Sequence, residues 1–130
     1  MSILEDLQLA LATLNIPIET GVFSDVAPYQ YIVVIPMSDT FDLHSDNLPR
    51  IDVQEARISL YTTGSYTALK NQVVQLLLAS SFTITARSYI GFEDDTGYYH
   101  YNVDVAKHYE MEELKMATIG LDKLYYATIT

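Results

Sequence analysis

The sequence predicts an α+β fold, an antiparallel sheet of four to five strands with two helices packed on one face. Two segments carry apolar residues at helical spacing, and several others alternate apolar with polar residues, as half-buried strands do. Their order along the chain is helix, two or three strands, helix, two strands, which is typical of this fold class. At 130 residues, the chain is long enough to bury one hydrophobic core without disulfides or metals.

The first helix is predicted over residues 2–14, where apolar residues recur every three or four positions. Ser2 and Glu5 have the spacing of a capping box, in which each side chain accepts a hydrogen bond from the other residue's backbone. Asn15 and Pro17 are typical of a helix end. The predicted apolar stripe consists of Ile3, Leu4, Leu7, Leu11 and Leu14.

Two short strands are predicted next, around residues 18–23 and 29–35, joined by a turn that contains Pro28. Pro36 is predicted to end the second strand, because proline has no N–H to donate to a strand ladder. Residues 37–50 are rich in polar and acidic side chains, and we expect them to form a long loop before the next strand.

The following strand is predicted over residues 51–63, and neither of its faces is purely apolar. We therefore expect both faces to be partly covered, one by the rest of the fold and the other by a neighbouring subunit. One face carries Ile51, Val53, Glu55, Arg57, Ser59 and Tyr61, and the other carries Asp52, Gln54, Ala56, Ile58 and Leu60.

The second helix is predicted over residues 64–80, with Ser65 as its N-cap. Its apolar stripe consists of Tyr66, Leu69, Val73, Leu76 and Leu77. The core of the whole domain is predicted to contain Leu7, Leu11, Ile32, Val34, Leu69, Val73, Leu76, Val103 and Val105.

A long hairpin is predicted over residues 81–110, with its turn at residues 93–97, where the sequence is Glu-Asp-Asp-Thr-Gly. In the first strand, alternation places Phe82, Ile84, Ala86 and Ser88 on one face and Thr83, Thr85, Arg87 and Tyr89 on the other. In the second strand, it places Tyr99, Tyr101, Val103 and Val105 on one face and Tyr98, His100, Asn102 and Asp104 on the other.

The chain is strongly acidic, with 7 Lys and Arg residues against 17 Asp and Glu residues and a formal net charge of −10. Such a surface repels phosphate backbones, which disfavours sequence-independent binding of DNA or RNA. Cysteine is absent, which excludes disulfides, thiolate metal sites and a thiol nucleophile. No stretch approaches the ~20 apolar residues that span a bilayer. Glu5 and Asp6 interrupt the apolar start of the chain, so it does not resemble a signal peptide.

Asp95, Thr96 and Gly97 form the active-site tripeptide of the aspartic proteases, in which two such aspartates share a proton. An apolar strand leads into the aspartate in those enzymes, whereas Glu93 and Asp94 precede it here. A solvated hairpin turn is therefore the preferred interpretation, and a dimeric aspartic protease that uses Asp95 is the alternative.

Asp42, His44 and Asp46 alternate, as the ligands of some metal loops do. Asn47 and Val53 stand where a calcium loop requires a glycine and a carboxylate, so a solvated loop is the preferred interpretation.

His100 and His108 lie ~26 Å apart on one strand at ~3.3 Å per residue, so they cannot bind the same ion. We expect His100 to be an exposed strand residue. No serine lies in a nucleophile-elbow pattern, and no glycine-rich loop precedes a helix. The sequence predicts no catalytic residues, no cofactor, no metal site and no enzymatic activity.

A family resemblance rests on the strand end at residues 33–36 (VVIP), on residues 46–61 (DNLPRIDVQEARISLY) and on the helix that follows. With these features, residues 29–77 resemble the tail terminators and head–tail joining proteins of long flexible-tailed phages and prophages of Gram-positive bacteria. The resemblance continues to about residue 113 and includes the strand at Tyr99.

The resemblance implies a structural protein without a cofactor. It would assemble with itself as a ring, commonly a hexamer, that caps the tail tube and joins it to the head connector. Its partners would be the major tail tube protein and a head-completion or connector protein, with DNA only as cargo that passes through the lumen. It would be assembled in the host cytoplasm and would reside in the virion at the tail–head junction.

The last fifteen residues, 116–130 (MATIGLDKLYYATIT), resemble the start of a major tail tube protein of the same phage group. We therefore expect a tail-completion domain over residues 1–115 and a C-terminal extension over residues 116–130.

Two groups of residues are candidates for assembly contacts in such a ring. Glu55 and Arg57 are the predicted subunit interface, where Arg57 or Arg50 would pair with a neighbour's carboxylates. The predicted assembly loop consists of Ser38, Asp39, Phe41, Asp42, Leu43, His44, Asp46, Asn47, Leu48 and Arg50.

Three alternatives stay open beside the tail terminator. One is another neck or head-completion adaptor of the same phage group, and another is a regulatory module that stays monomeric and binds one host protein. The third is the dimeric aspartic protease. A mobile loop without a partner is the alternative for residues 37–50.

Overall fold

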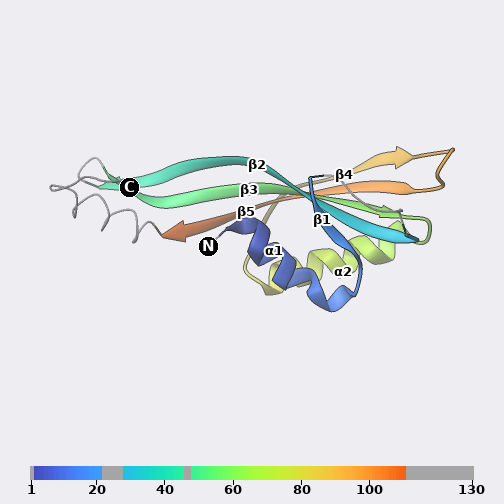
Figure 1. Ribbon diagram of the computed structural model, residues 1–130. Coiled ribbons are helices and arrows are strands. Elements are labelled where there is room, and N and C mark those ends of the chain that lie inside the picture. The colour runs from blue at the N-terminus through green and yellow to red at the C-terminus, as the bar shows by residue number, and fades with distance from the viewer. Residues whose placement is uncertain (1, 22–27, 46–47, 111–130) are drawn as a thin grey trace. The chain divides into compact units, whose positions relative to one another are not determined.

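The computed structural model describes residues 2–21, 28–45 and 48–110, with side chains for residues 2–21, 28–41 and 51–110. One sheet of five strands and two α-helices confirm the predicted α+β fold (Figure 1). The elements are α1 (Ile3–Leu11), a 3-10 helix (Ala12–Leu14), β1 (Ile18–Thr20), β2 (Gln30–Ser45), β3 (Leu48–Thr62), α2 (Tyr66–Ala79), β4 (Thr83–Phe92) and β5 (Tyr99–Glu110). Within the described residues, neither helix is long and apolar enough to cross a membrane.

The chain divides into two compact units. The first unit comprises residues 1–38 and 54–107, and it contains both helices, β1, β4 and parts of β2, β3 and β5. The second unit comprises residues 39–53 and 108–130, and its described part consists of the remaining residues of β2, β3 and β5.

Both helices begin at their predicted caps. The Ser2 side chain accepts a hydrogen bond from the Glu5 N–H at 3.2 Å, and the Glu5 carboxylate accepts one from the Ser2 N–H at 3.1 Å. The 3-10 helix that follows α1 ends at Asn15, which adopts the left-handed conformation (φ 56°) that asparagine tolerates. Ser65 caps α2 by accepting a hydrogen bond from the Ala68 N–H at 3.2 Å.

The strands are ordered β1-β2-β3-β5-β4, and their pairing is mostly antiparallel. β1 is the exception, because it lies parallel to β2 with Ile18 opposite Ile32 and Thr20 opposite Val34. The prediction of a purely antiparallel sheet is therefore wrong at this edge. Residues 21–29 separate the two strands, which is more than a tight hairpin needs, and Pro28 alone does not specify that the chain reverses.

The predicted loop over residues 37–50 is wrong. β2 continues through Pro36 to Ser45, and β3 begins at Leu48, so most of this polar segment is strand. The loop was predicted from the polar composition of this segment, but a strand that is open to water can carry polar residues on both faces.

Pro36 is tolerated inside β2 because of the direction of its backbone nitrogen. The Ile32 N–H donates to the Pro17 carbonyl at 2.9 Å, and the Val34 carbonyl accepts from the Gly21 N–H at 3.0 Å. The backbone N–H and C=O groups of the even-numbered residues in this stretch therefore point toward β1. Backbone groups of every second residue point the same way along a strand, so the nitrogen of Pro36 points to this side too. β1 pairs with β2 only as far as Val34, so among the described residues no strand pairs with the position of the missing Pro36 N–H.

The β4–β5 hairpin has the predicted pairing but not the predicted alternation. Ile84 is opposite Val105, whereas Ala86 is opposite Asp104, so β4 has one extra residue at this point. Such a bulge shifts the side-chain pattern by one position. Arg87 consequently shares a face with Ile84, not the opposite face as strict alternation predicts.

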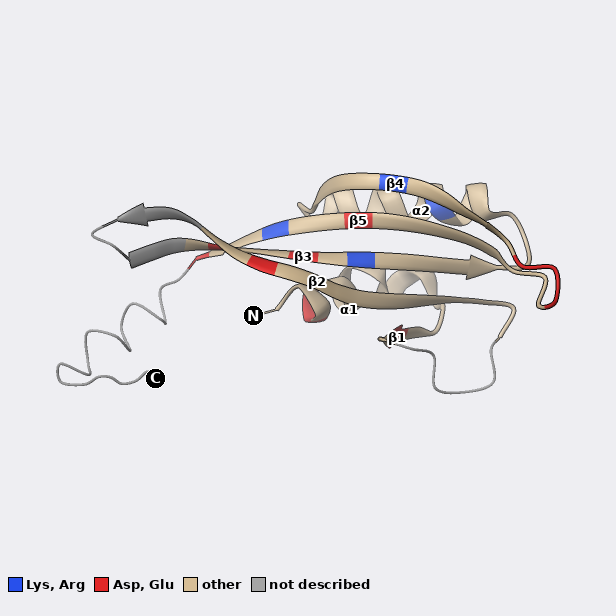
Figure 2. Ribbon diagram, turned by 90° about the horizontal axis from the view of Figure 1, so that it is seen from above, with Lys and Arg blue, Asp and Glu red and all other residues tan. Residues whose placement is uncertain are grey.

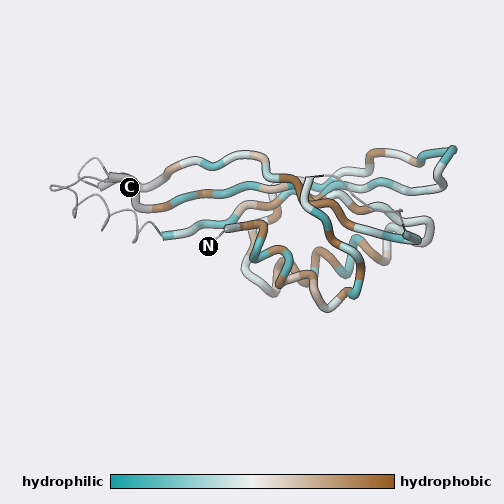
Figure 3. The backbone as a smooth tube through the Cα atoms, viewed as in Figure 1, coloured by the Kyte–Doolittle hydropathy of each residue, from teal (hydrophilic) through white to brown (hydrophobic). Residues whose placement is uncertain are grey.

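The hydrophobic core of the first unit lies between the sheet and the two helices (Figure 3). All predicted core residues are buried except Leu76, which is only half-buried. The buried residues of α2 are Leu69, Val73 and Leu77, four residues apart along one face, and all three belong to the predicted stripe. Burial of each large side chain contributes ~1.5–3 kcal/mol relative to exposure. Ile3 of the predicted α1 stripe is buried as well, and the core also contains residues that the prediction did not name: Ile16, Ala56, Ile58, Leu60 and Phe82.

Candidate assembly surface

The two described helices, α1 and α2, cover the same face of the sheet in the first unit, and no described helix lies on the opposite face (Figure 1). Strand alternation points Ile32, Ile58 and Val103 into the core, so their neighbours along each strand point to the other side. We call this other side the helix-free face; it carries Tyr31, Val33, Ile35 and Met37 of β2, Glu55, Arg57, Ser59 and Tyr61 of β3, and His100, Asn102, Asp104 and Ala106 of β5.

Polar pairs fix the centre of the helix-free face. Arg57 donates two hydrogen bonds to the Asp104 carboxylate, from Nε at 2.8 Å and from Nη2 at 3.1 Å. The Arg57 side chain is 41% exposed and that of Asp104 is 15% exposed, and their hydrogen bond raises the pKa of Arg57. Beside them, the buried Ser59 hydroxyl donates to Asn102 Oδ1 at 2.9 Å.

This pairing changes the role expected of Arg57. The sequence suggested that Arg57 pairs with a carboxylate of a neighbouring subunit, but in the structure its partner is Asp104 of the same chain. Glu55 lies two residues earlier on the same face and is partly exposed. The sequence showed Asn102 and Asp104 on one face of their strand, but it could not show that β3 provides their partners.

An aromatic group continues the helix-free face beyond the polar pairs. The rings of Tyr31 and Tyr61 stack with centroids 4.7 Å apart, and His100 stacks on Tyr61 at 4.2 Å. The Tyr98 ring meets Tyr31 edge-on at 5.3 Å, and the Tyr98 hydroxyl donates to the Pro28 carbonyl. These contacts hold four rings from three segments in one arrangement.

Burial within this aromatic group shifts three pKa values. Desolvation, with smaller contributions from Tyr61 and Tyr98, raises the pKa of Tyr31 to about 12. Desolvation likewise raises the pKa of Tyr61 and lowers the pKa of His100, because burial penalises each charged form. The prediction that His100 is exposed is wrong, since it is partly buried and its buried Nε2 atom has no hydrogen-bond partner among the described residues.

The helix-free face combines rigid, paired polar groups with aromatic rings and one exposed apolar side chain. Met37 is 46% exposed, at the end of the β2 row that starts with Tyr31. Protein interfaces are enriched in tyrosine, methionine and arginine, which occur together on this face. Its chemistry suits contact with another protein surface.

The second unit contains most of the predicted assembly loop, now seen as strand. Asp39 and Phe41 are exposed in β2, and Phe41 has 55% of its surface accessible. Ser38, the last β2 residue of the first unit, is exposed as well. The remaining predicted contact residues lie outside the described side chains; they are Asp42, Leu43, His44, Asp46, Asn47, Leu48 and Arg50.

The predicted metal ligands and the predicted C-terminal extension also lie outside what the structure describes. Asp42, His44 and Asp46 belong to the stretch without described side chains, and the boundary after residue 115 falls in the undescribed residues 111–130. Among the described residues, no group of three or more His, Asp or Glu side chains is placed to hold a metal ion.

Asp95 of the protease-like tripeptide is exposed in the turn between β4 and β5, where acidic residues gather (Figure 2). The Gly97 N–H donates to the Glu93 carbonyl at 2.7 Å, and the Glu93 N–H donates to the Tyr98 carbonyl at 2.8 Å. The Thr96 hydroxyl donates to the Glu93 carboxylate at 2.7 Å. The interpretation of this tripeptide as a solvated hairpin turn is confirmed.

No protein-family model matches the chain, and a comparison with curated proteins finds no match either. Three features of the chain bear on its function: the sequence resemblance, the helix-free face and the exposed residues of β2.

Proposed function

We propose that this chain is a structural phage protein that assembles as a ring, caps the tail tube and joins it to the head connector. The resemblance of residues 29–77 to tail terminators supports this assignment, and so does the tube-like sequence of residues 116–130. The observation that carries it in the structure is the helix-free face, with its interface-like composition and no described helix over it.

A ring subunit needs surfaces that do not rearrange when neighbours dock. On the helix-free face, the two hydrogen bonds of Arg57 and the bond of Ser59 fix side chains before any contact forms. Fewer side chains then lose freedom on association, which lowers the entropic cost of binding. A ring also requires two different contact surfaces on each subunit, because its contacts are heterologous.

The exposed residues of β2 in the second unit supply a further contact for the proposed assembly. Phe41 offers an exposed aromatic ring, which suits contact with the tube or an adjoining ring, and the exposed Asp39 lies two residues before it on the same strand. The acidic charge of the chain disfavours adhesion of DNA, which is consistent with DNA as passing cargo.

Light scattering of the purified chain, alone and with assembled tail tubes, tests the proposal. We expect the chain to bind tube ends and to form a closed oligomer there, even if it is monomeric alone. Met37→Glu places a charge on the helix-free face and should prevent this association. Leu9→Glu is the matched control, because Leu9 is 76% exposed on α1, away from that face.

Circular dichroism would verify that both variants fold. A chain that stays monomeric in the presence of assembled tubes contradicts the proposal. Binding to a connector protein without binding to tubes would instead indicate another neck adaptor. Equal loss of assembly in both variants would show that the effect of Met37→Glu is not specific to the helix-free face.

A further inference from the structure

β4 is the last strand of the sheet, and its outer edge has no partner strand among the described residues. A row of unpaired N–H and C=O groups on such an edge can pair with an added strand from another polypeptide. Register shifts lie between Ile84 and Ala86 and between Tyr89 and Gly91, so the regular part of this edge is short. It extends over residues 86–89 and is exposed.

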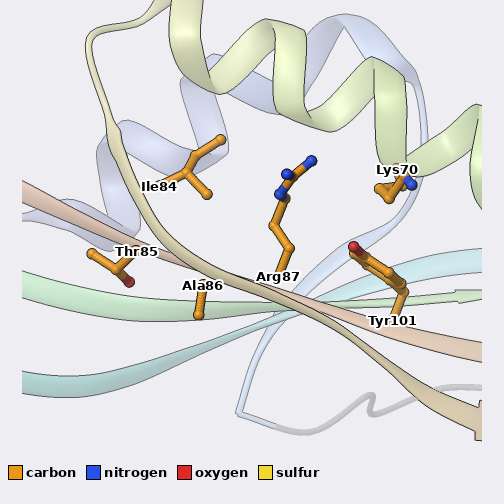
Figure 4. Close-up of a pocket in the computed structure, with 6 residues that line it drawn as sticks. All are labelled: Lys70, Ile84, Thr85, Ala86, Arg87 and Tyr101. Carbon is orange, nitrogen blue, oxygen red and sulfur yellow. The ribbon is translucent and has the colours of Figure 1, made fainter.

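A pocket of about 460 Å³ lies beside this edge, between β4 and α2. Its walls are Lys70, Ile84, Thr85, Ala86, Arg87 and Tyr101. Figure 4 shows Arg87 extending from β4 toward α2, with Lys70 and the Tyr101 hydroxyl on the same side. The bulge after Ile84 is what turns Arg87 to this side of the strand.

The pocket concentrates positive charge in an acidic chain. Lys70 Nζ lies 5.4 Å from the centre of the Tyr101 ring. Within the described part of the chain, neither Lys70 nor Arg87 forms an ion pair with a carboxylate, whereas Arg57 and Lys107 do. Two cations without an acidic partner, next to a hydroxyl, form a favourable site for a carboxylate.

We propose that the edge of β4 and the adjacent pocket bind an extended acidic segment of another protein. The segment pairs its backbone with residues 86–89, and one Glu or Asp side chain enters the pocket and binds Lys70 and Arg87. This surface is separate from the helix-free face, so the inference does not depend on the proposed ring or on its tube partner.

The chemistry of the pocket selects against other peptides. A basic segment would be repelled by Lys70 and Arg87, and an apolar one would leave both cations without a partner. Among the described residues, no Asp or Glu side chain lies in the pocket lining, and this includes the acidic β4–β5 turn, so none of these carboxylates occupies the site.

The test uses the full chain and a synthetic peptide, acetyl-Thr-Val-Glu-Val-Glu-Val-Thr-amide, whose glutamates alternate as strand residues do. Binding is measured by NMR titration, and hydrogen exchange reports whether the β4 amides become protected. The control peptide has glutamine in place of both glutamates. The protein variants are Lys70→Ala with Arg87→Ala together, and Arg87→Lys as the charge-conserving variant.

We expect the acidic peptide to protect β4 amides and to bind roughly tenfold more tightly than the glutamine peptide. The double alanine variant should lose this preference, while Arg87→Lys should retain most of it. Equal binding of both peptides, or perturbation confined to other strands, overturns the proposal. So does an absence of binding at about 2 mM peptide. Self-association of the wild-type chain that the double variant abolishes would assign the site to a second copy instead.

Discussion

Three consecutive leucines in α2 provide a direct test of how this helix is oriented on the sheet. Leu77 is fully buried, with 0% exposure, while Leu78 is 59% exposed and Leu76 is half-buried. The same substitution, leucine to alanine, changes helix propensity equally at all three positions. Differences among the three variants therefore measure burial alone.

Leu77→Ala should lower the free energy of unfolding by about 3 kcal/mol, within the ~2–5 kcal/mol observed when a buried leucine leaves a cavity. Leu78→Ala should change it by less than ~0.5 kcal/mol, because an exposed side chain leaves no cavity. Leu76→Ala should fall between them, at about 1 kcal/mol.

Urea unfolding, followed by far-UV circular dichroism, measures these differences. With a slope of ~2 kcal/mol per molar urea, Leu77→Ala should move the midpoint down by about 1.5 M. The Leu78→Ala midpoint should stay within ~0.3 M of the wild type. A loss of about 3 kcal/mol at Leu78, with a smaller loss at Leu77, would mean that α2 is rotated by ~100° about its axis, and it would refute the core described above.

Three further predictions concern the helix-free face. A double-mutant cycle of Arg57→Ala and Asp104→Ala should give a coupling energy of about 0.5–1 kcal/mol in urea unfolding, because the pair is bidentate but partly exposed; additive losses would contradict the pairing. Since burial lowers the pKa of His100, its contribution to stability is present above about pH 6.5 and is lost as pH falls. His100→Phe should therefore show a weaker drop in urea midpoint between about pH 7.5 and 5.5 than the wild type, and an equal drop would refute the assignment. Tyr31 should ionise near pH 12, and so its contribution to stability is lost as pH rises from 10 to about 12. In an ultraviolet pH titration, Tyr31→Phe should remove an ionisation step near pH 12. Loss of a step near pH 10 instead would contradict the burial of Tyr31.

The features that the sequence predicted well are local. Ser2 and Ser65 cap helices because their side chains reach N–H groups three residues away, and that spacing is visible in the chain. The turn before Gly97 is similarly encoded by a few adjacent residues. In α2, the period of 3.6 fits both Leu76 and Leu77, and only packing against the sheet decides that Leu77 is buried.

The features that the sequence could not predict depend on pairing between distant segments. Pro36 indicates the end of a strand unless one knows that its nitrogen points toward the β1 side of β2, where no described residue pairs beyond Val34. Arg87 faces the pocket only because the register with β5 contains a bulge. Alternation placed His100 and Asp104 on one face, but their contacts with Tyr61 and Arg57 require the alignment of β3 with β5.

Pro36 has a consequence for how the chain behaves at high concentration. An exposed strand edge with a complete row of donors is a template for amyloid-like stacking, in which every copy adds the next. At Pro36, the β2 edge carries a proline ring where another residue would have an N–H donor. β1 already occupies the edge up to Val34. A strand that approaches this edge finds its register interrupted at Pro36, which disfavours growth of a fibre from this side. The proline thus acts as a gatekeeper against misassembly while the strand itself remains intact.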